Sequence, residues 1–146
     1  GLTLFDLPAV AEQARQRFAR EGIADRATAI GGSFLHDPLP GGADLVTLVR
    51  VIHDHDDAEA LAILERVHSA LVPGGSLLLA EPMAGTPGAE PVGAYFGFYL
   101  LAMGSGRPRT ASELTALLHE AGFVHVRQLS TRMPLQSGAL VARRDA

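Results

Sequence analysis

The stretch DLVTLVRVIHDHDD, residues 44–57, decides the fold because it leads from a strand directly into a helix. Residues 44–51 are a continuous β-rich run, which predicts a buried parallel strand. Residues 56–71 carry apolar side chains at helical spacing and begin with Asp56 and Asp57, which favour the positive end of a helix. A strand that passes into a helix is the unit of an α/β sheet.

The same alternation extends from this stretch in both directions. Further strands are predicted at residues 2–5, 27–30, 76–80, 123–129 and 139–143, and further helices at residues 9–21 and 110–121. Val10, Ala14 and Phe18 lie at helical spacing on one face of the first helix, and the Pro73-Gly74-Gly75 run is expected to form a turn. Thr110 and Glu113 have the spacing of a capping box. The predicted fold is α/β, a Rossmann-like sheet with helices on both faces and a C-terminal antiparallel hairpin.

Composition narrows the function classes. The chain has 146 residues, 47% hydrophobic and 19% charged, a size and composition that suit one globular domain. A net charge of −4 gives no electrostatic attraction to nucleic acid, and the lack of cysteine excludes disulfides and thiolate chemistry. The longest apolar stretch, residues 92–103, is too short for an integral membrane segment. With no recognisable signal peptide, we expect a cytoplasmic protein, and basic residues that are all arginine are typical of a GC-rich bacterial genome.

Polar side chains follow three predicted strands at their carboxyl ends, where ligands bind in open α/β sheets. Asp6 follows the first strand, His53 and Asp54 follow the 44–51 strand, and Glu81 follows the 76–80 strand. A carboxylate can accept two hydroxyl hydrogen bonds from a ribose, and an imidazole titrates near neutral pH, as a general base requires. Taken together, these residues predict a site at one edge of the sheet.

Five segments resemble a known family in their order along the chain. They are LFDLP (4–8), GGSF (31–34), DLVTLVRVIHDHDD (44–57), LVPGGSLLLAEPM (71–83) and GRPRTASELTALLHEAGF (106–123). They resemble the class I S-adenosylmethionine-dependent O-methyltransferases that act on small molecules. The segment YFGFYLLAMGSGRPRT (95–110) is most similar to bacterial carotenoid O-methyltransferases acting on hydroxyneurosporene or demethylspheroidene.

The resemblance implies S-adenosylmethionine as cofactor, with no metal required. Asp6 would bind the ribose hydroxyls with Leu7 beside them, and Ser33 and Phe34 would flank the adenine. Arg50 stands where the family often has an aromatic residue near the cofactor.

For catalysis, the resemblance implies that His53 is the general base, with Asp54 adjacent and Glu81 orienting the ring. A second orienting acid is expected at Pro108, where proline cannot serve, so the base would be held less firmly or by another residue. The substrate would be a hydrophobic small molecule with a hydroxyl group, such as a carotenoid.

The aromatic segment after residue 94 has more than one interpretation. Tyr95, Phe96, Tyr99 and Met103 are predicted to line a substrate pocket, and a buried helix or a homodimer contact would explain them equally well. Pro87, Gly88, Pro91 and Gly93 before them predict a loop that acts as a lid. His68 and His119 are expected to face solvent on their helices.

Two other functions remain open from the residues alone. His53, His55 and Asp57 have the spacing of metal ligands, which would fit a metal-dependent hydrolase. A non-catalytic binding or dimerisation module is the second alternative.

The resemblance also implies that residues 1–146 are part of a catalytic domain. The family's first strand with its Gly-rich loop and its N-terminal dimerisation domain are expected to lie outside this sequence. We therefore expect the isolated chain to be inactive and to bind S-adenosylmethionine weakly or not at all.

Overall fold

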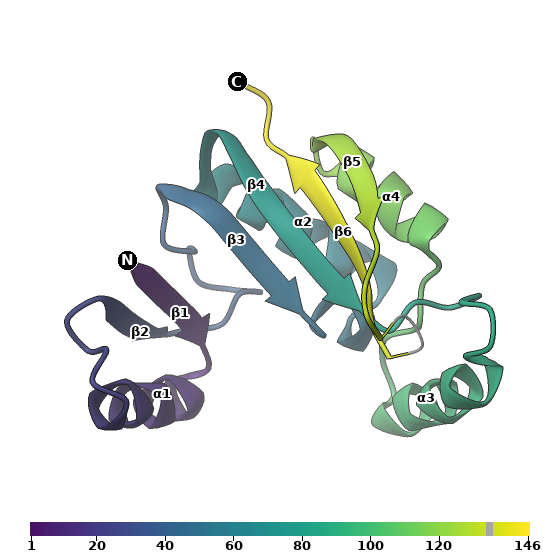
Figure 1. The fold of residues 1–146 in the computed structure, drawn as a ribbon, viewed down its shortest axis with the longest axis horizontal. Helices are drawn as coiled ribbons and strands as arrows, with labels where there is room; N and C mark the ends of the chain where they lie inside the picture. The colour runs from purple at the N-terminus through teal and green to yellow at the C-terminus, as the bar shows by residue number, and fades with distance from the viewer. Residues whose placement is uncertain (134–135) are drawn as a thin grey trace. The chain divides into compact units, whose positions relative to one another are not determined.

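The computed structural model describes residues 1–133 and 136–146, which form two compact units, residues 1–40 and 41–146 (Figure 1). Each unit is described by itself.

The first unit is a β-α-β motif. Its elements are β1 (Leu2–Asp6), α1 (Pro8–Arg20) and β2 (Ala27–Gly31), and β1 and β2 pair in parallel with Asp6 opposite Gly31. Proline suits the first turn of α1 because it has no N–H to leave unpaired there. The predicted elements are confirmed to within one or two residues. The buried residue of α1 is Ala11, whereas Val10 is 40% exposed.

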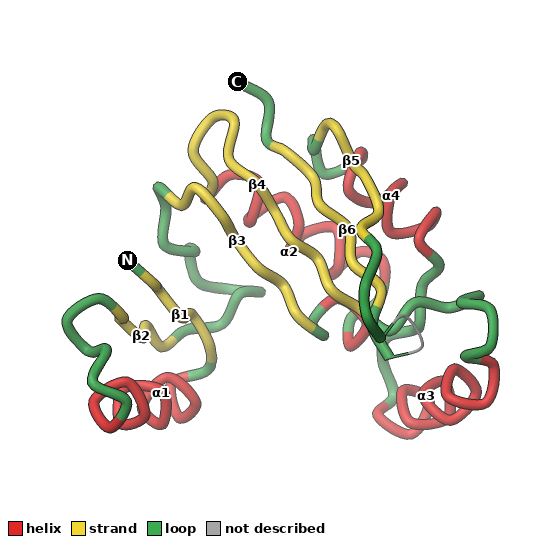
Figure 2. Tube along the Cα trace, viewed as in Figure 1, coloured by secondary structure: helices red, strands yellow, loops and turns green. Residues whose placement is uncertain are grey.

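The second unit contains a four-stranded mixed sheet of order β3-β4-β6-β5 (Figures 1 and 2). Its elements are β3 (Ala43–Val49), the 3-10 turn η1 (Ile52–Asp54), α2 (Asp57–Ala70), β4 (Leu71–Glu81), α3 (Glu90–Met103), α4 (Ala111–Glu120), β5 (Val124–Leu129) and β6 (Gly138–Arg143). β3 and β4 are parallel, whereas β6 runs antiparallel to both β4 and β5, so the predicted C-terminal hairpin is confirmed. None of the described helices is long and apolar enough to cross a bilayer.

Helices α2 and α4 pack against the same face of this sheet. The core combines Leu77 and Leu79 of β4 with Leu64 of α2 and with Leu114 and Leu118 of α4. On the other face Leu45 and Val49 of β3 are 56% and 57% exposed, and within residues 41–133 and 136–146 neither α2 nor α4 covers it. The run at 44–51 is thus a parallel strand as predicted, but it is not buried on both faces, because a strand's sequence does not specify what packs on each side.

The expected turn at Pro73-Gly74-Gly75 is also wrong, since β4 runs through these residues. The pairing with β3 shifts register between Ala43 and Leu45, opposite this segment. A Cβ on Gly75 would lie 2.8 Å from the Val72 carbonyl oxygen and 3.2 Å from that of Ala43. The glycine is therefore needed for close approach of backbone within the sheet.

Helix α3 begins earlier than the sequence predicts. It includes Pro91 and Gly93, which the sequence places in a lid loop, because proline is tolerated in the first turn of a helix. It ends at Gly104, which adopts φ +81°, the left-handed conformation typical of a helix end. Tyr95, Phe98 and Leu101 are 72–77% exposed, so α3 is not the buried helix of one interpretation.

His68 on α2 does not face solvent. Its ring lies edge-on to Phe123 with 5.0 Å between centroids, and its Nε2 atom is buried with no hydrogen-bond partner among the described residues. A buried polar atom without a partner lowers stability because its bonds to water are lost and not replaced.

We therefore expect His68→Phe to stabilise the protein by about 1 kcal/mol, since phenylalanine keeps the edge-on contact and removes the unpaired nitrogen. The midpoint of thermal unfolding should rise by about 2–4 °C. The same change at exposed His36 serves as the control. An unchanged or lower midpoint for His68→Phe would show that Nε2 finds a partner in solution.

Candidate active site

The turn η1 between β3 and α2 brings His53 against the end of β4. His53 is 5% exposed and Glu81 is 2% exposed, and His53 Nδ1 lies 2.5 Å from Glu81 Oε2. Because β3 and β4 are parallel neighbours, residues that follow them meet at the same edge of the sheet. The structure therefore brings together the predicted base and the acid predicted to orient it.

The other oxygen of Glu81 is fixed by backbone. Oε1 accepts hydrogen bonds from the N–H groups of Val51 at 2.9 Å and Ile52 at 2.8 Å. One carboxylate therefore holds both the imidazole ring and the backbone that enters the turn. Its remaining freedom is small, because each oxygen is occupied.

Asp54 lies on the opposite side of the imidazole. Its Oδ1 atom is 3.1 Å from His53 Nε2, and its side chain is 46% exposed. Both ring nitrogens thus face carboxylates, an arrangement that stabilises the ring once it has gained a proton. The exposed Asp54 side chain is the one that can turn aside for another molecule.

Phe96 of α3 connects the base with two other predicted residues. Its ring lies edge-on to His53 with 4.8 Å between centroids, and it stacks on Tyr99 at 5.9 Å. The Arg50 guanidinium lies 5.4 Å from the Phe96 centroid, and Arg50 itself has an uncommon positive φ of 57°. Phe96 and Tyr99 therefore form an aromatic wall beside His53.

Two other residues predicted to line the pocket do not join this wall. Tyr95 and Met103 are 75% and 61% exposed. Tyr95 points to a different side of the helix because it is the direct neighbour of Phe96 in sequence. Met103 is the last residue of α3, about two turns beyond Phe96.

The remaining predicted cofactor residues belong to the first unit. Asp6 ends β1, accepts the Leu7 N–H at 2.7 Å through Oδ1, and accepts the Gly32 N–H at 2.9 Å through its carbonyl oxygen. Ser33 and Phe34 come two and three residues after the end of β2. The parallel pairing of β1 and β2 therefore places a carboxylate and an aromatic residue after strands that end at the same sheet edge. A hydrogen-bond acceptor and an aromatic ring suit a ribose and an adenine ring.

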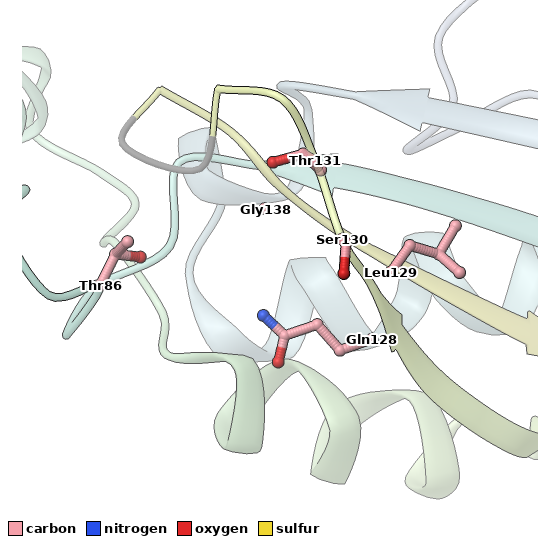
Figure 3. A pocket seen from close by; sticks show the side chains of 6 residues that line it. All are labelled: Thr86, Gln128, Leu129, Ser130, Thr131 and Gly138. Carbon is pink, nitrogen blue, oxygen red and sulfur yellow. The ribbon is translucent and has the colours of Figure 1, made fainter.

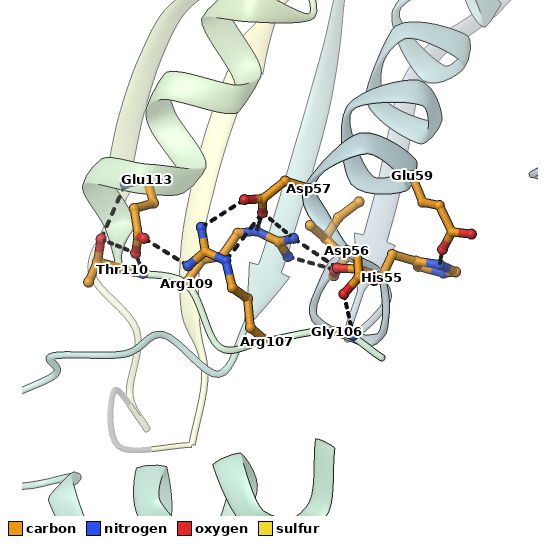
Figure 4. Close-up of polar contacts among 10 residues, drawn as sticks. His55, Asp56, Asp57, Glu59, Gly106, Arg107, Arg109, Thr110 and Glu113 are labelled. Atoms are coloured by element: carbon orange, nitrogen blue, oxygen red, sulfur yellow. Dashed lines mark hydrogen bonds and ion pairs between the residues drawn. The ribbon is translucent and has the colours of Figure 1, made fainter. Parts of the chain in front are cut away.

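Arg109 is a buried residue that the sequence does not predict. It is 2% exposed, and its guanidinium donates to the carbonyl oxygens of Ile52 and His55 and to the carboxylate of Asp57 (Figure 4). Asp57, predicted as a charged helix start and as a ligand in the metal-site alternative, binds both Arg107 and Arg109. No local pattern could reveal this, because arginine is normally exposed and its partners lie more than fifty residues away.

The three residues of the metal-site alternative turn to different partners. His53 faces Glu81, Asp57 binds the two arginines, and His55 Nδ1 lies 3.1 Å from Glu59. Within residues 1–133 and 136–146, no group of three His, Asp or Glu side chains is placed to hold a metal ion.

A cavity of about 460 Å³ lies near the ends of β5 and β6 (Figure 3). It is lined by Thr86, Gln128, Leu129, Ser130, Thr131 and Gly138. None of the predicted site residues lines it, and none of its side chains is charged. It therefore adds nothing to the chemistry of the His53 site.

The charge cluster beside the turn makes stability depend on pH. Hydrogen bonds from the Thr110 backbone, the Arg107 guanidinium and the Thr110 hydroxyl lower the pKa of Glu113 from 4.5 to about 2 (Figure 4). The folded pKa is below the unfolded one, so the unfolded chain binds a proton first as pH falls. The stabilisation is complete above about pH 5 and is lost as pH drops toward about 2.

We expect the free energy of unfolding to decline over this pH range, and to decline less steeply in Glu113→Gln, which cannot be protonated. Denaturant unfolding at a series of pH values measures both slopes. Arg107 and Arg109 also lower the pKa of Asp57, so part of the slope should persist in the variant. Equal slopes in the two proteins would contradict the assigned role of Glu113.

Comparison with known proteins gives matches along nearly the whole chain. The model of an O-methyltransferase domain family matches residues 1–124. Demethylspheroidene O-methyltransferase of Cereibacter sphaeroides is 45% identical over 148 aligned residues, covering 99% of this chain and 38% of that protein.

Two solved structures resemble the fold. The structure of LaPhzM aligns with a TM-score of 0.86 at 32% identity, covering 97% of this chain and 42% of that one. Human N-acetylserotonin methyltransferase, solved in complex with SAM, aligns with a TM-score of 0.81 at 30% identity, covering 99% of this chain and 40% of that one. The chain therefore spans about two fifths of the length of these relatives.

Proposed function

This chain belongs to the family of O-methyltransferase domains, and from that membership we propose that it carries the catalytic base of an enzyme that methylates a hydroxyl oxygen. The methyl donor is S-adenosylmethionine, and the acceptor is a hydrophobic small molecule. His53 is the base, Glu81 orients it, and Asp54 assists.

The observation that carries the proposal is the arrangement around His53. Glu81 accepts a hydrogen bond from Nδ1 at 2.5 Å, which leaves the lone pair of the neutral ring on Nε2. Nε2 lies on the side of the exposed Asp54 side chain, where an acceptor hydroxyl can approach. This is the tautomer that a general base needs.

When bound, S-adenosylmethionine supplies a methyl group activated by a positively charged sulfur. Nε2 of His53 takes the proton from the acceptor hydroxyl as its oxygen bonds to the methyl carbon and the sulfur–carbon bond breaks. General-base assistance of this kind contributes about 10²–10⁴-fold. Glu81 and Asp54 stabilise the protonated ring, and Glu81 keeps it from rotating.

The residues of the first unit fit the cofactor. We propose that the Asp6 carboxylate accepts hydrogen bonds from the ribose hydroxyls beside Leu7, and that Ser33 and Phe34 flank the adenine. Arg50, beside the Phe96 ring, is proposed to lie near the cofactor.

For the acceptor, Phe96 and Tyr99 provide an apolar wall next to the base. A long apolar molecule with a hydroxyl group suits such a wall, and a 45% identical relative is named for demethylspheroidene. We therefore propose a hydroxylated carotenoid such as demethylspheroidene or hydroxyneurosporene as the substrate.

The test supplies the whole protein with S-adenosylmethionine labelled in its methyl group. One acceptor is a hydroxylated carotenoid, a second is the same carotenoid already O-methylated, and a third is a small hydroxylated aromatic. Label is expected in the first and not in the second, because only the first has a hydroxyl oxygen. Methyl transfer to the aromatic alone would support the proposed O-methylation but contradict a carotenoid as the substrate. Transfer to none of the three acceptors would count against both the reaction and the substrate.

A further inference from the structure

We infer that Arg109 positions the catalytic base, by holding the backbone of the turn that carries His53 while Glu81 holds its ring. The inference rests on the proposed role of His53. It names a positioning residue, since Arg109 touches neither the imidazole nor any reacting group.

Arg109 contacts the backbone on both sides of His53 in the chain. Its Nη1 atom donates to the carbonyl oxygen of Ile52 at 2.9 Å, and Nη2 donates to that of His55 at 2.8 Å. Nε and Nη2 also donate to Asp57 Oδ1 at 2.9 and 2.7 Å. The guanidinium is rigid and planar, so these three acceptors are fixed relative to one another (Figure 4).

Arg109 and Glu81 hold complementary groups of the same turn. Glu81 accepts the N–H of Ile52, and Arg109 donates to the carbonyl of the same residue. The turn η1 is three residues long and has no side-chain cap of its own. Its position therefore depends on these two distant side chains.

The segment before Arg109 packs on the same turn. We call residues 105–109 the strap. Ser105 Oγ donates to the Asp54 carbonyl at 3.2 Å, and the Gly106 N–H donates to Asp56 Oδ1 at 3.0 Å. Gly106 has φ +81°, and a Cβ there would overlap the carbonyl oxygen of His53. The strap therefore lies directly against the backbone of His53, with Gly106 next to its carbonyl oxygen.

This arrangement supplies what Pro108 cannot. The sequence left open what holds the base in place of a second acid at position 108. We infer that Arg109, one residue after Pro108, holds the base instead. It does so through the backbone of the turn and not through the imidazole ring. If Arg109 is lost, the turn can shift, and the 2.5 Å contact between His53 and Glu81 should lengthen.

The first experiment replaces Arg109 in the whole protein with methionine and with lysine, and Arg107 with methionine as the control. Arg107 binds Asp57 and Glu113 but no carbonyl of the turn. Three quantities are measured: kcat, the KM for S-adenosylmethionine, and the downfield proton NMR signal of the hydrogen bond between His53 Nδ1 and Glu81, assigned by its loss in His53→Ala.

Arg109→Met should lower kcat by about tenfold or more and remove the downfield signal, because small displacements of a reacting group are costly. Its KM should change little. Arg109→Lys should retain more of kcat and of the downfield signal than Arg109→Met, because it keeps a positive charge. It should still fall short of the parent, since one ammonium group cannot reach all three acceptors. Arg107→Met should stay within about threefold of the parent and retain the signal.

A second pair of variants applies if Arg109→Met does not fold. Gly106→Ala and Gly104→Ala place the same methyl group on backbones of the same φ, +81°, but only Gly106 faces His53, while Gly104 has nothing within 4 Å. Gly106→Ala should weaken the downfield signal and kcat, and Gly104→Ala should weaken neither.

The inference is overturned if folded Arg109→Met keeps the signal and kcat, or if the two alanine variants behave alike. A different result would contradict the proposed function itself. If His53 were not the base, His53→Ala would retain methyl transfer, whatever the NMR signal of the Arg109 variants shows.

Discussion

Replacing Glu81 with glutamine is expected to lower the turnover of methyl transfer by about 10²–10⁴-fold, the contribution of the base itself, while the protein stays folded, because it gives the base the wrong tautomer. Glu81 has two oxygens and three hydrogen-bond donors to satisfy: the backbone N–H groups of Val51 and Ile52 on Oε1, and the His53 ring on Oε2. Glutamine has one acceptor oxygen. If that oxygen keeps the two amides, the NH₂ group must face Nδ1 of His53, which then has to be the acceptor.

The proton of the neutral imidazole would consequently sit on Nε2, where the substrate hydroxyl needs a lone pair. The reverse orientation of the glutamine is costly, since it leaves two N–H groups facing an NH₂ group, at about 1–3 kcal/mol for each group without a partner. We therefore expect the unproductive tautomer to dominate. Nitrogen chemical shifts of His53 report the tautomer directly, alongside kcat.

Glu59→Gln is the matched control, because His55 and Glu59 form a second histidine–glutamate pair that is more exposed, at 3.1 Å. It should change kcat by less than about threefold. If Glu81→Gln kept its turnover with the proton still on Nδ1, Glu81 would not orient the base.

Features set by neighbouring residues could be predicted from the sequence. The capping box is an example: Thr110 accepts the Glu113 N–H at 3.2 Å, and Glu113 accepts the Thr110 N–H at 2.8 Å. The approach of His53 and Glu81 was also predictable, because parallel strands that are neighbours end at one edge. Strand and helix periodicity, with that one topological rule, is enough to place the base and its acid.

Features set by distant segments could not be predicted. Arg109 is buried only because Asp57 and two carbonyl groups of the turn meet it there. The exposure of Val49 depends on what covers one sheet face, and the burial of His68 depends on Phe123 packing against it. No side-chain pattern within a segment records these partners. They arise from the tertiary packing, which also determines how firmly the base is held.

His53→Ala is expected to lower kcat by about 10²–10⁴-fold, the contribution of a general base, and to leave the affinity for S-adenosylmethionine nearly unchanged. The reason for the unchanged affinity is that the proposed cofactor residues Asp6, Ser33 and Phe34 belong to the first unit and are left intact by the substitution. Stopped-flow or quenched single-turnover assays should be used, so that product release does not hide the chemical step. His55→Ala, two residues away and paired with Glu59, is the control and should remain within about threefold.

Combining the two substitutions separates a base from a residue that merely supports the fold. Glu81 is proposed to act only through the imidazole ring, so adding Glu81→Gln to His53→Ala should cost almost no further activity, although each change alone is severe. Independent roles would make the two losses multiply. A double variant far slower than His53→Ala alone would mean that Glu81 acts on the substrate or cofactor directly. The Glu81 carboxylate would then have a catalytic role of its own, and the proposed mechanism would be wrong on this point.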